Sequence, residues 1–177
     1  MYKTISKVAE KFFTKSQIFK YGFNWSPMYR RSTAKLTYVS DDLLTVTIKI
    51  PISYKNKNYV GSIFGGSLFS ATDPIYMIQL LNILGDDFVV WDKSAKIKYK
   101  RPAKSDVYAS FKFSKDEIEV IKQKVIVQGE FDCEKQLLIT TKDGTIISEV
   151  EKTMYVATKS YYKNKRKLKS KTAEKSQ

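Results

Sequence analysis

Residues 66–84 limit the fold of this chain more than any other stretch. Their apolar side chains lie on nearly all sides of a helix instead of along one stripe, so the helix has to be buried on most of its surface. The stretch nevertheless starts after Gly65 and contains Asp73-Pro74. Inside a helix a glycine costs roughly 1 kcal/mol and a proline roughly 3 kcal/mol, and a buried carboxylate needs a partner. The remaining chain must therefore cover this helix, and its irregular residues need an explanation.

The segments around this helix predict strands that would cover it. Strands are expected over residues 34–40, 43–50, 87–100, 106–113, 125–142 and 145–157. The clearest case is residues 44–50, where apolar and polar residues alternate with the period of two that marks a half-buried strand. Asp143-Gly144 is a strong hairpin signal. Because there is no βαβ alternation, the pattern predicts an α+β fold in which a curved antiparallel sheet wraps around the central helix.

Three further segments complete the predicted organisation. The helical spacing of apolar residues predicts a short amphipathic helix over 3–13, and an aromatic connector follows over 21–31. A capping box that starts at Ser114 predicts a helix over about 115–123. We therefore divide the 177 residues into an N-terminal helical segment (1–20), one domain (21–158) and a tail (159–177).

The tail carries eight Lys and Arg residues against one Glu, which is half of the net charge of +14. It has no apolar period, so we expect a flexible basic segment that raises solubility. Contact with nucleic acid or with anionic lipid is the alternative. A nucleic-acid-binding function would rest on this tail alone, because the chain has no recognisable nucleic-acid-binding motif.

The chain contains no histidine, which excludes Ser-His-Asp and Cys-His catalysis and the common zinc sites. We therefore expect no metal centre, and a general base has to be Asp, Glu, Lys or Tyr. The single Cys133 rules out an internal disulfide and fits a reducing compartment. We find no apolar leader and no run of about 20 apolar residues, so we expect a cytoplasmic protein without membrane insertion.

The residues before and inside the central helix follow a spaced motif. Asn58 stands six residues before Phe64, and the triplet Phe64-Gly65-Gly66 is followed seven residues later by Asp73. This arrangement resembles the hotdog-fold acyl-CoA thioesterases of the phenylacetate-pathway type, which carry Asn, His-Gly-Gly and an acidic residue at these spacings. The resemblance extends over about residues 20–157, includes the stretch KYKRPA at 98–103, and is closest to an uncharacterised bacterial branch of that superfamily.

The resemblance implies a single hotdog domain that assembles as a homodimer or a dimer of dimers, with sites at the interface. It implies metal-independent hydrolysis of an acyl-CoA thioester, in which coenzyme A is part of the substrate and no other cofactor is needed. Asp73 would be the nucleophile or the general base, and the Gly65 N–H would polarise the thioester carbonyl. Asn58 and Asp92 would assist them. A helix N-terminus suits this task, because its unpaired N–H groups and its dipole favour developing negative charge.

Six further residues are candidates for binding the substrate: Phe64, Gly66, Ser67, Lys100, Arg101 and Lys104. The three basic residues lie at or after the end of the strand over 87–100 and would bind the phosphates of coenzyme A. Phe64 stands where the family has histidine and cannot form the hydrogen bonds of that residue. A non-catalytic protein that binds acyl-CoA is therefore the main alternative to a thioesterase.

Structural interpretations stay open for the same residues: a tight turn at 65–66, a loop residue at Asn58, a backbone-bonded carboxylate at Asp73, surface pairing of Asp92 with Lys93 or Lys96, and a solvated basic loop at 100–104. Phe69 and Tyr76 of the central helix would either line an acyl tunnel or pack in the core. We favour core packing for both, because an aromatic side chain on a buried helix usually belongs to the core.

Overall fold

The computed structural model of the chain describes residues 12–174, except the side chains of 169–174. Its helices are α2 (Lys15–Trp25), α3 (Pro27–Arg30), α4 (Gly65–Thr72), α5 (Ile75–Leu84), α6 (Lys115–Gln128) and α7 (Lys159–Glu174). Its strands are β1 (Lys35–Val39), β2 (Thr45–Ile50), β3 (Phe88–Tyr99), β4 (Val107–Lys112), β5 (Glu130–Thr140) and β6 (Ile146–Thr158). The strands pair antiparallel in one sheet with the order β1-β2-β4-β5-β6-β3.

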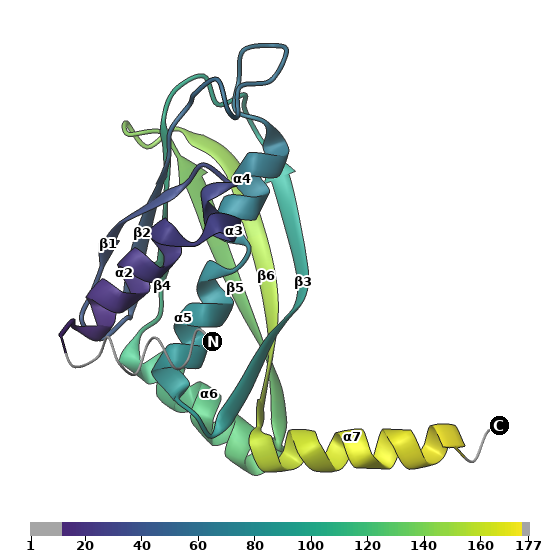
Figure 1. The fold of residues 1–177 in the computed structure, drawn as a ribbon. Coiled ribbons are helices and arrows are strands. Elements are labelled where there is room, and N and C mark those ends of the chain that lie inside the picture. Colours follow the sequence, from purple (N-terminus) through teal and green to yellow (C-terminus); the bar gives the residue numbers. More distant parts are fainter. Residues whose placement is uncertain (1–11, 175–177) are drawn as a thin grey trace.

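The sheet curves around the central helix, as Figure 1 shows, and the predicted architecture is confirmed. Buried residues of α4 and α5 form the middle of the core: Leu68, Ala71, Ile75, Tyr76 and Leu80. Every second residue of β2 is buried against them, in agreement with the alternation in the sequence. The buried faces of β2, β4, β5 and β6 therefore supply most of the cover that the apolar helix requires, whereas β3 buries only Val90.

The central helix is broken where the sequence has Asp73-Pro74, so the single helix expected over 66–84 is two helices, α4 and α5. Proline has no N–H to donate to the preceding turn, and its ring interferes with the carbonyl group four residues earlier. Both residues of the break keep right-handed backbone angles, with φ/ψ of −54/−55° at Asp73 and −86/−9° at Pro74. Pro74 therefore interrupts the hydrogen bonds of the helix without reversing its direction.

An N-terminal helix is present, as predicted, but it lies later in the chain than expected. Residues 3–11 of the expected helix lie outside the described residues, and Phe12 and Phe13 precede α2, which begins at Lys15 after a capping box. The aromatic connector expected over 21–31 is wrong, because its residues form the end of α2 and all of α3. The aromatic side chains explain this: Phe23 packs on Phe19 one turn earlier and on Tyr29 of α3, with ring centroids 4.9 and 5.0 Å apart.

Two boundaries near the C-terminus also differ. Residues 125–128, expected in a strand, continue α6 up to Gly129, whose φ of 81° ends the helix. Residues 159–174 form helix α7, although we expected no regular structure in the basic tail. The first turns of α7 are held to the sheet, since Lys165 forms an ion pair with Glu130 and a Cβ at Gly129 would lie 2.3 Å from the Tyr161 ring.

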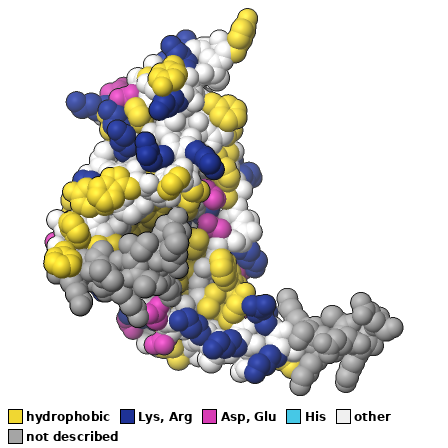
Figure 2. Space-filling model, in the orientation of Figure 1, with side chains coloured by type: hydrophobic (Ala, Val, Ile, Leu, Met, Phe, Trp, Pro, Cys, Tyr) yellow, Lys and Arg dark blue, Asp and Glu magenta, His cyan; other side chains and the backbone are white. Residues whose placement is uncertain are grey.

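Helix α7 projects away from the sheet in Figure 1, and Figure 2 shows basic side chains along its first turns.

Within residues 12–174 we find no helix that is long and apolar enough to cross a lipid bilayer. The domain limits drawn from the sequence stay predictions.

Candidate active site

A buried lysine lies against the break in the central helix. Lys152 of β6 is only 2% exposed. Its Nζ atom lies 2.9 Å from Asp73 Oδ1, 2.8 Å from the Asp73 carbonyl oxygen and 3.0 Å from Asp92 Oδ1. An ammonium group has three N–H donors, and here three acceptors surround it. The charge of this buried lysine is therefore fully partnered by the two carboxylates that the sequence singled out.

The strands bring these groups together. Lys152 follows the inward positions of β6, between the buried residues Val150 and Met154. On β3 the register against β6 shifts between Asp92 and Ser94. Such an irregularity redirects side chains, and the Asp92 carboxylate meets Lys152 with 26% of its side chain exposed. The alternative that Asp92 pairs with Lys93 or Lys96 is wrong, because Lys93 bonds Asp132 instead.

Asp73 occupies the junction of two helix ends. It is the C-cap residue of α4 and directly precedes Pro74, the N-cap residue of α5. A cation is favourable at the C-terminus of a helix and an anion at the N-terminus, so Lys152 and the Asp73 carboxylate complement both helix dipoles. Half of the Asp73 side chain remains exposed. The carboxylate is thus held by Lys152 and still accessible.

Burial raises the pKa of Asp92 above its ordinary value of 3.8, with a further contribution from the nearby Asp73 charge, and Lys152 offsets only part of this. Between the pKa of Asp92 in the unfolded chain and its higher pKa in the folded protein, the folded protein binds more protons than the unfolded chain. The contribution of Asp92 to the free energy of unfolding therefore falls as pH rises through this interval.

Asp92→Asn cannot ionise and still offers Lys152 an oxygen. We therefore expect this variant to be at least as stable as wild type at pH 7, and to lose that advantage as pH falls below about 4. Urea unfolding at pH 3.5 to 7 measures the difference. A variant that is less stable than wild type only at pH 7 would show that the attraction to Lys152 outweighs burial.

A pocket of about 400 Å³ lies at the other end of α4. Four of the residues predicted from the sequence line it: Asn58, Gly65, Lys100 and Arg101. Tyr99 closes one side by donating its hydroxyl to the Gly65 carbonyl over 3.0 Å. A Cβ at Gly65 would lie 2.9 Å from the Tyr99 ring, so a side chain at this position would displace the tyrosine from its place beside the pocket.

The amides of Gly65 and Gly66 begin α4, and within the described residues neither donates to a protein acceptor. Phe64, the N-cap residue, provides no side-chain cap. Unpaired N–H groups at a helix N-terminus attract an anion or a polarised carbonyl oxygen. This end of the helix can therefore hold a carbonyl oxygen that becomes negatively charged.

The other predicted residues differ in their bonding partners and in whether they line the pocket. The Asn58 amide is occupied on both sides, since it donates to Ser62 Oγ and accepts from Ser62 N, each over 3.0 Å. Lys100 forms an ion pair with Glu149 at 3.1 Å, and Arg101 donates to the Ile146 carbonyl over 3.0 Å. Ser67 is half-buried, and Phe64 and Lys104 are exposed; none of these three lines the pocket.

Asp73 and Asp92 do not line this pocket. The eight residues of α4 separate Gly65 from Asp73 by about 12 Å at 1.5 Å per residue. Within one chain the candidate residues therefore form two groups, with the amide donors at the start of α4 and the carboxylates at its end.

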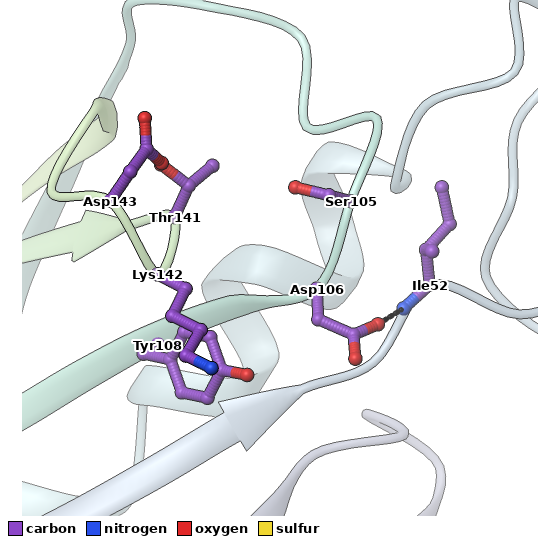
Figure 3. A pocket seen from close by; sticks show the side chains of 7 residues that line it. All are labelled: Ile52, Ser105, Asp106, Tyr108, Thr141, Lys142 and Asp143. Carbon is purple, nitrogen blue, oxygen red and sulfur yellow. Dashed lines mark hydrogen bonds between the residues drawn. The ribbon is translucent and has the colours of Figure 1, made fainter.

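A second hollow, of about 650 Å³, lies between the start of β4 and the β5–β6 hairpin, and Figure 3 shows its lining residues. Its carboxylates already have partners. Asp106 accepts from Ile52 N at 2.9 Å and pairs with Lys49 at 2.7 Å, and Asp143 accepts from Thr145 Oγ1 at 2.9 Å. The hollow contains no candidate residue from the sequence. In the part of the chain that the structure describes, no group of three metal-ligating side chains comes together.

The sequence analysis missed Lys152. The signal was present, because the alternation of β6 places this lysine on the same face as Val150, Met154 and Val156. A lysine on an otherwise apolar strand face has to meet a carboxylate or another acceptor.

Comparisons with known proteins agree with this architecture. A family described as "Domain of unknown function (DUF4442)" matches residues 15–156. No curated protein matches the chain. Among solved structures, a Pseudomonas aeruginosa protein of unknown function described as a probable thioesterase has a TM-score of 0.72 at 18% identity, covering 80% of this chain and 95% of that one.

Two further structures are similar. A thioesterase from Haemophilus influenzae has a TM-score of 0.59 at 12% identity, with 82% and 92% of the two chains covered. A hypothetical thioesterase from Streptococcus pneumoniae, crystallised with coenzyme A, has a TM-score of 0.50 at 16% identity, with 71% and 86% covered. At these identities the likeness shows the fold, and the predicted hotdog class is confirmed.

Proposed function

The chain belongs to the family described as "Domain of unknown function (DUF4442)", and from this premise we propose that it hydrolyses acyl-CoA or related acyl thioesters. The observation that carries the proposal is the Asp73 carboxylate, half exposed at a break of the central helix and bonded to a buried ammonium group. Hotdog-fold structures described as thioesterases support the same reaction class.

The proposed reaction uses groups at both ends of α4. The thioester carbonyl accepts hydrogen bonds from the amides of Gly65 and Gly66, which stabilise the negative charge that develops on oxygen. Asp73 takes a proton from a water molecule whose oxygen adds to the carbonyl carbon, or attacks that carbon directly. The C–S bond then breaks. In the base route, the proton that Asp73 took from water passes to the sulfur, which leaves as the free thiol, and the acid is released directly. In the nucleophile route, the thiolate leaves and takes a proton from solvent, and water then hydrolyses the mixed anhydride on Asp73, which releases the acid and restores the carboxylate. The chemistry needs no metal.

Coenzyme A would lie along the pocket beside Gly65, with its phosphates near Lys100 and Arg101. Lys104, exposed just beyond, would extend this basic edge. The coenzyme A complex of the Streptococcus pneumoniae protein is a precedent for this ligand on a hotdog fold.

The spacing within α4 favours a site shared by two subunits. About 12 Å between Gly65 and Asp73 is too far for both to touch one thioester group. A homodimer that places Gly65 of one chain beside Asp73 of the other would complete the site. Strand β3 lies at an edge of the sheet and exposes Trp91 and Tyr99, which suits an interface with a second copy.

Mixing two inactive variants tests this arrangement. Gly65→Pro removes one of the two amide donors at a helix position where proline is tolerated. If the site is shared, a heterodimer of Gly65→Pro and Asp73→Asn has one intact site, and random re-assortment should restore about a quarter of wild-type turnover. If each chain holds a whole site, the mixture stays as inactive as its parts. Light scattering of the wild-type chain gives the oligomeric state on which the prediction depends.

A non-catalytic acyl-CoA-binding protein is the second candidate. It is favoured by Phe64, which offers no hydrogen bond where the resemblance predicts histidine and is 58% exposed. Free-thiol release from short, long and aromatic acyl-CoAs separates the two functions. Turnover supports the hydrolase, and binding of coenzyme A by the folded chain without thiol release would leave the binding protein as the better account.

A further inference from the structure

The buried Lys152 has no role in the reaction as written, and its contacts point to one. We propose that Lys152 is the positioning residue of this site, which fixes the orientation of the Asp73 carboxylate. This inference rests on the proposed hydrolase function.

The geometry of the ammonium group supports positioning. Two of its three bonds go to Asp73, one to the carbonyl oxygen at 2.8 Å and one to Oδ1 at 2.9 Å. Holding the backbone and the side chain of one residue on the same ammonium group restricts the side-chain torsion of that residue. The third bond, to Asp92 at 3.0 Å, ties the arrangement to β3. One side chain of β6 therefore connects the helix break with the neighbouring strand.

The charges around Lys152 support the same role. The described charged groups that face it are Asp73 from the helix break, Asp92 from β3 and Lys135 from β5. Lys135 stands opposite Lys152 in the sheet register but bonds Glu117 of α6 at 2.7 Å. Lys152 therefore forms its ion pairs with the two aspartates. Asp92 is the less exposed of the two, with 26% of its side chain accessible against 50% for Asp73, so Asp73 is the carboxylate that a substrate can reach.

Packing alone does not account for a lysine at this inward position. An apolar side chain of similar volume would fill the same space, and replacing a buried ion pair in this way is often neutral for stability. Removing only the lysine differs, because it leaves Asp92 partly buried without its cation. The double variant Lys152→Met/Asp92→Asn removes both charges and separates the structural effect from the positioning effect.

The test compares Lys152→Met, Lys152→Arg and the double variant with Lys98→Met as matched control. Lys98 pairs with Glu151 at 3.3 Å on the surface of β3. We expect the double variant to recover the urea stability that Lys152→Met loses, yet to keep kcat for thiol release about 10- to 100-fold below wild type with little change in KM. Lys152→Arg, which keeps a cation beside Asp73, should recover part of the lost kcat. Lys98→Met should match wild type.

A second readout does not depend on turnover. In a crystal structure of Lys152→Met, or of the double variant if the single one does not fold, the Asp73 carboxylate should leave the position in which Lys152 holds it in wild type. An unmoved carboxylate, or full kcat in the double variant, would overturn the inference and make Lys152 a structural residue only. Absence of thiol release from wild type overturns the hydrolase proposal instead.

Discussion

Asp73→Asn is expected to lower kcat for acyl-CoA hydrolysis by about 10²- to 10⁴-fold, the usual contribution of a positioned base. Asparagine retains an oxygen for Lys152 but has no negative charge with which to attack the carbonyl carbon or take a proton from water. Because Asp73 acts on the thioester, whereas the phosphates of coenzyme A would be held by Lys100 and Arg101, binding of the coenzyme A part should change little. The measurement is thiol release under saturating substrate, with coenzyme A binding followed by calorimetry.

A matched control comes from a carboxylate with a similar surface partner. Asp132 on β5 bonds Lys93 and lies outside both pockets, so Asp132→Asn should leave kcat and KM at wild-type values. Turnover that survives in Asp73→Asn while the variant stays folded would move the chemistry to another group. Asp92 would be tested next, because it shares Lys152 with Asp73.

Most of the strands were predictable because they bury one face. Alternation from Thr45 to Ile50 reports directly which side chains point into the core, and the structure follows it residue by residue. The helices near the N-terminus were not predictable, because the aromatic residues of 21–31 have no clear helical or strand period in the sequence. Their positions are decided by the contacts of Phe23 with Phe19 and Tyr29, which form only when the chain folds back on itself.

The candidate site also contains residues that the sequence identified and one that it did not. Asn58, Gly65 and Asp73 were found because they belong to one short motif with fixed spacing. Lys152 lies 79 residues from Asp73 and meets it only through the sheet. Periodicity marked this lysine as facing inward, but no local pattern states which carboxylate it will meet. The register of β3 against β6, with its shift after Asp92, supplies that information.

Tyr76→Ala is expected to destabilise the fold by about 3–5 kcal/mol, as truncation of a buried aromatic side chain usually does. The residue is 2% exposed, and its ring meets Phe111 and Phe113 edge-on with centroids 4.9 and 5.4 Å away. Alanine would leave a cavity between α5 and β4 and remove both aromatic contacts. Urea unfolding measures the loss as a shift of the midpoint at constant slope.

The paired variant Tyr76→Phe separates the ring from its hydroxyl. The hydroxyl lies 3.4 Å from the Gln136 carbonyl oxygen, long for a hydrogen bond, so its removal should cost about 1 kcal/mol or less. The two variants also decide between core packing and an acyl tunnel at this position. A core residue sets stability and leaves the preference for acyl-chain length unchanged in the fraction that stays folded. If Tyr76→Ala instead kept wild-type stability and accepted longer chains, the ring would line the acyl site, and the substrate would reach the interior between α5 and the sheet.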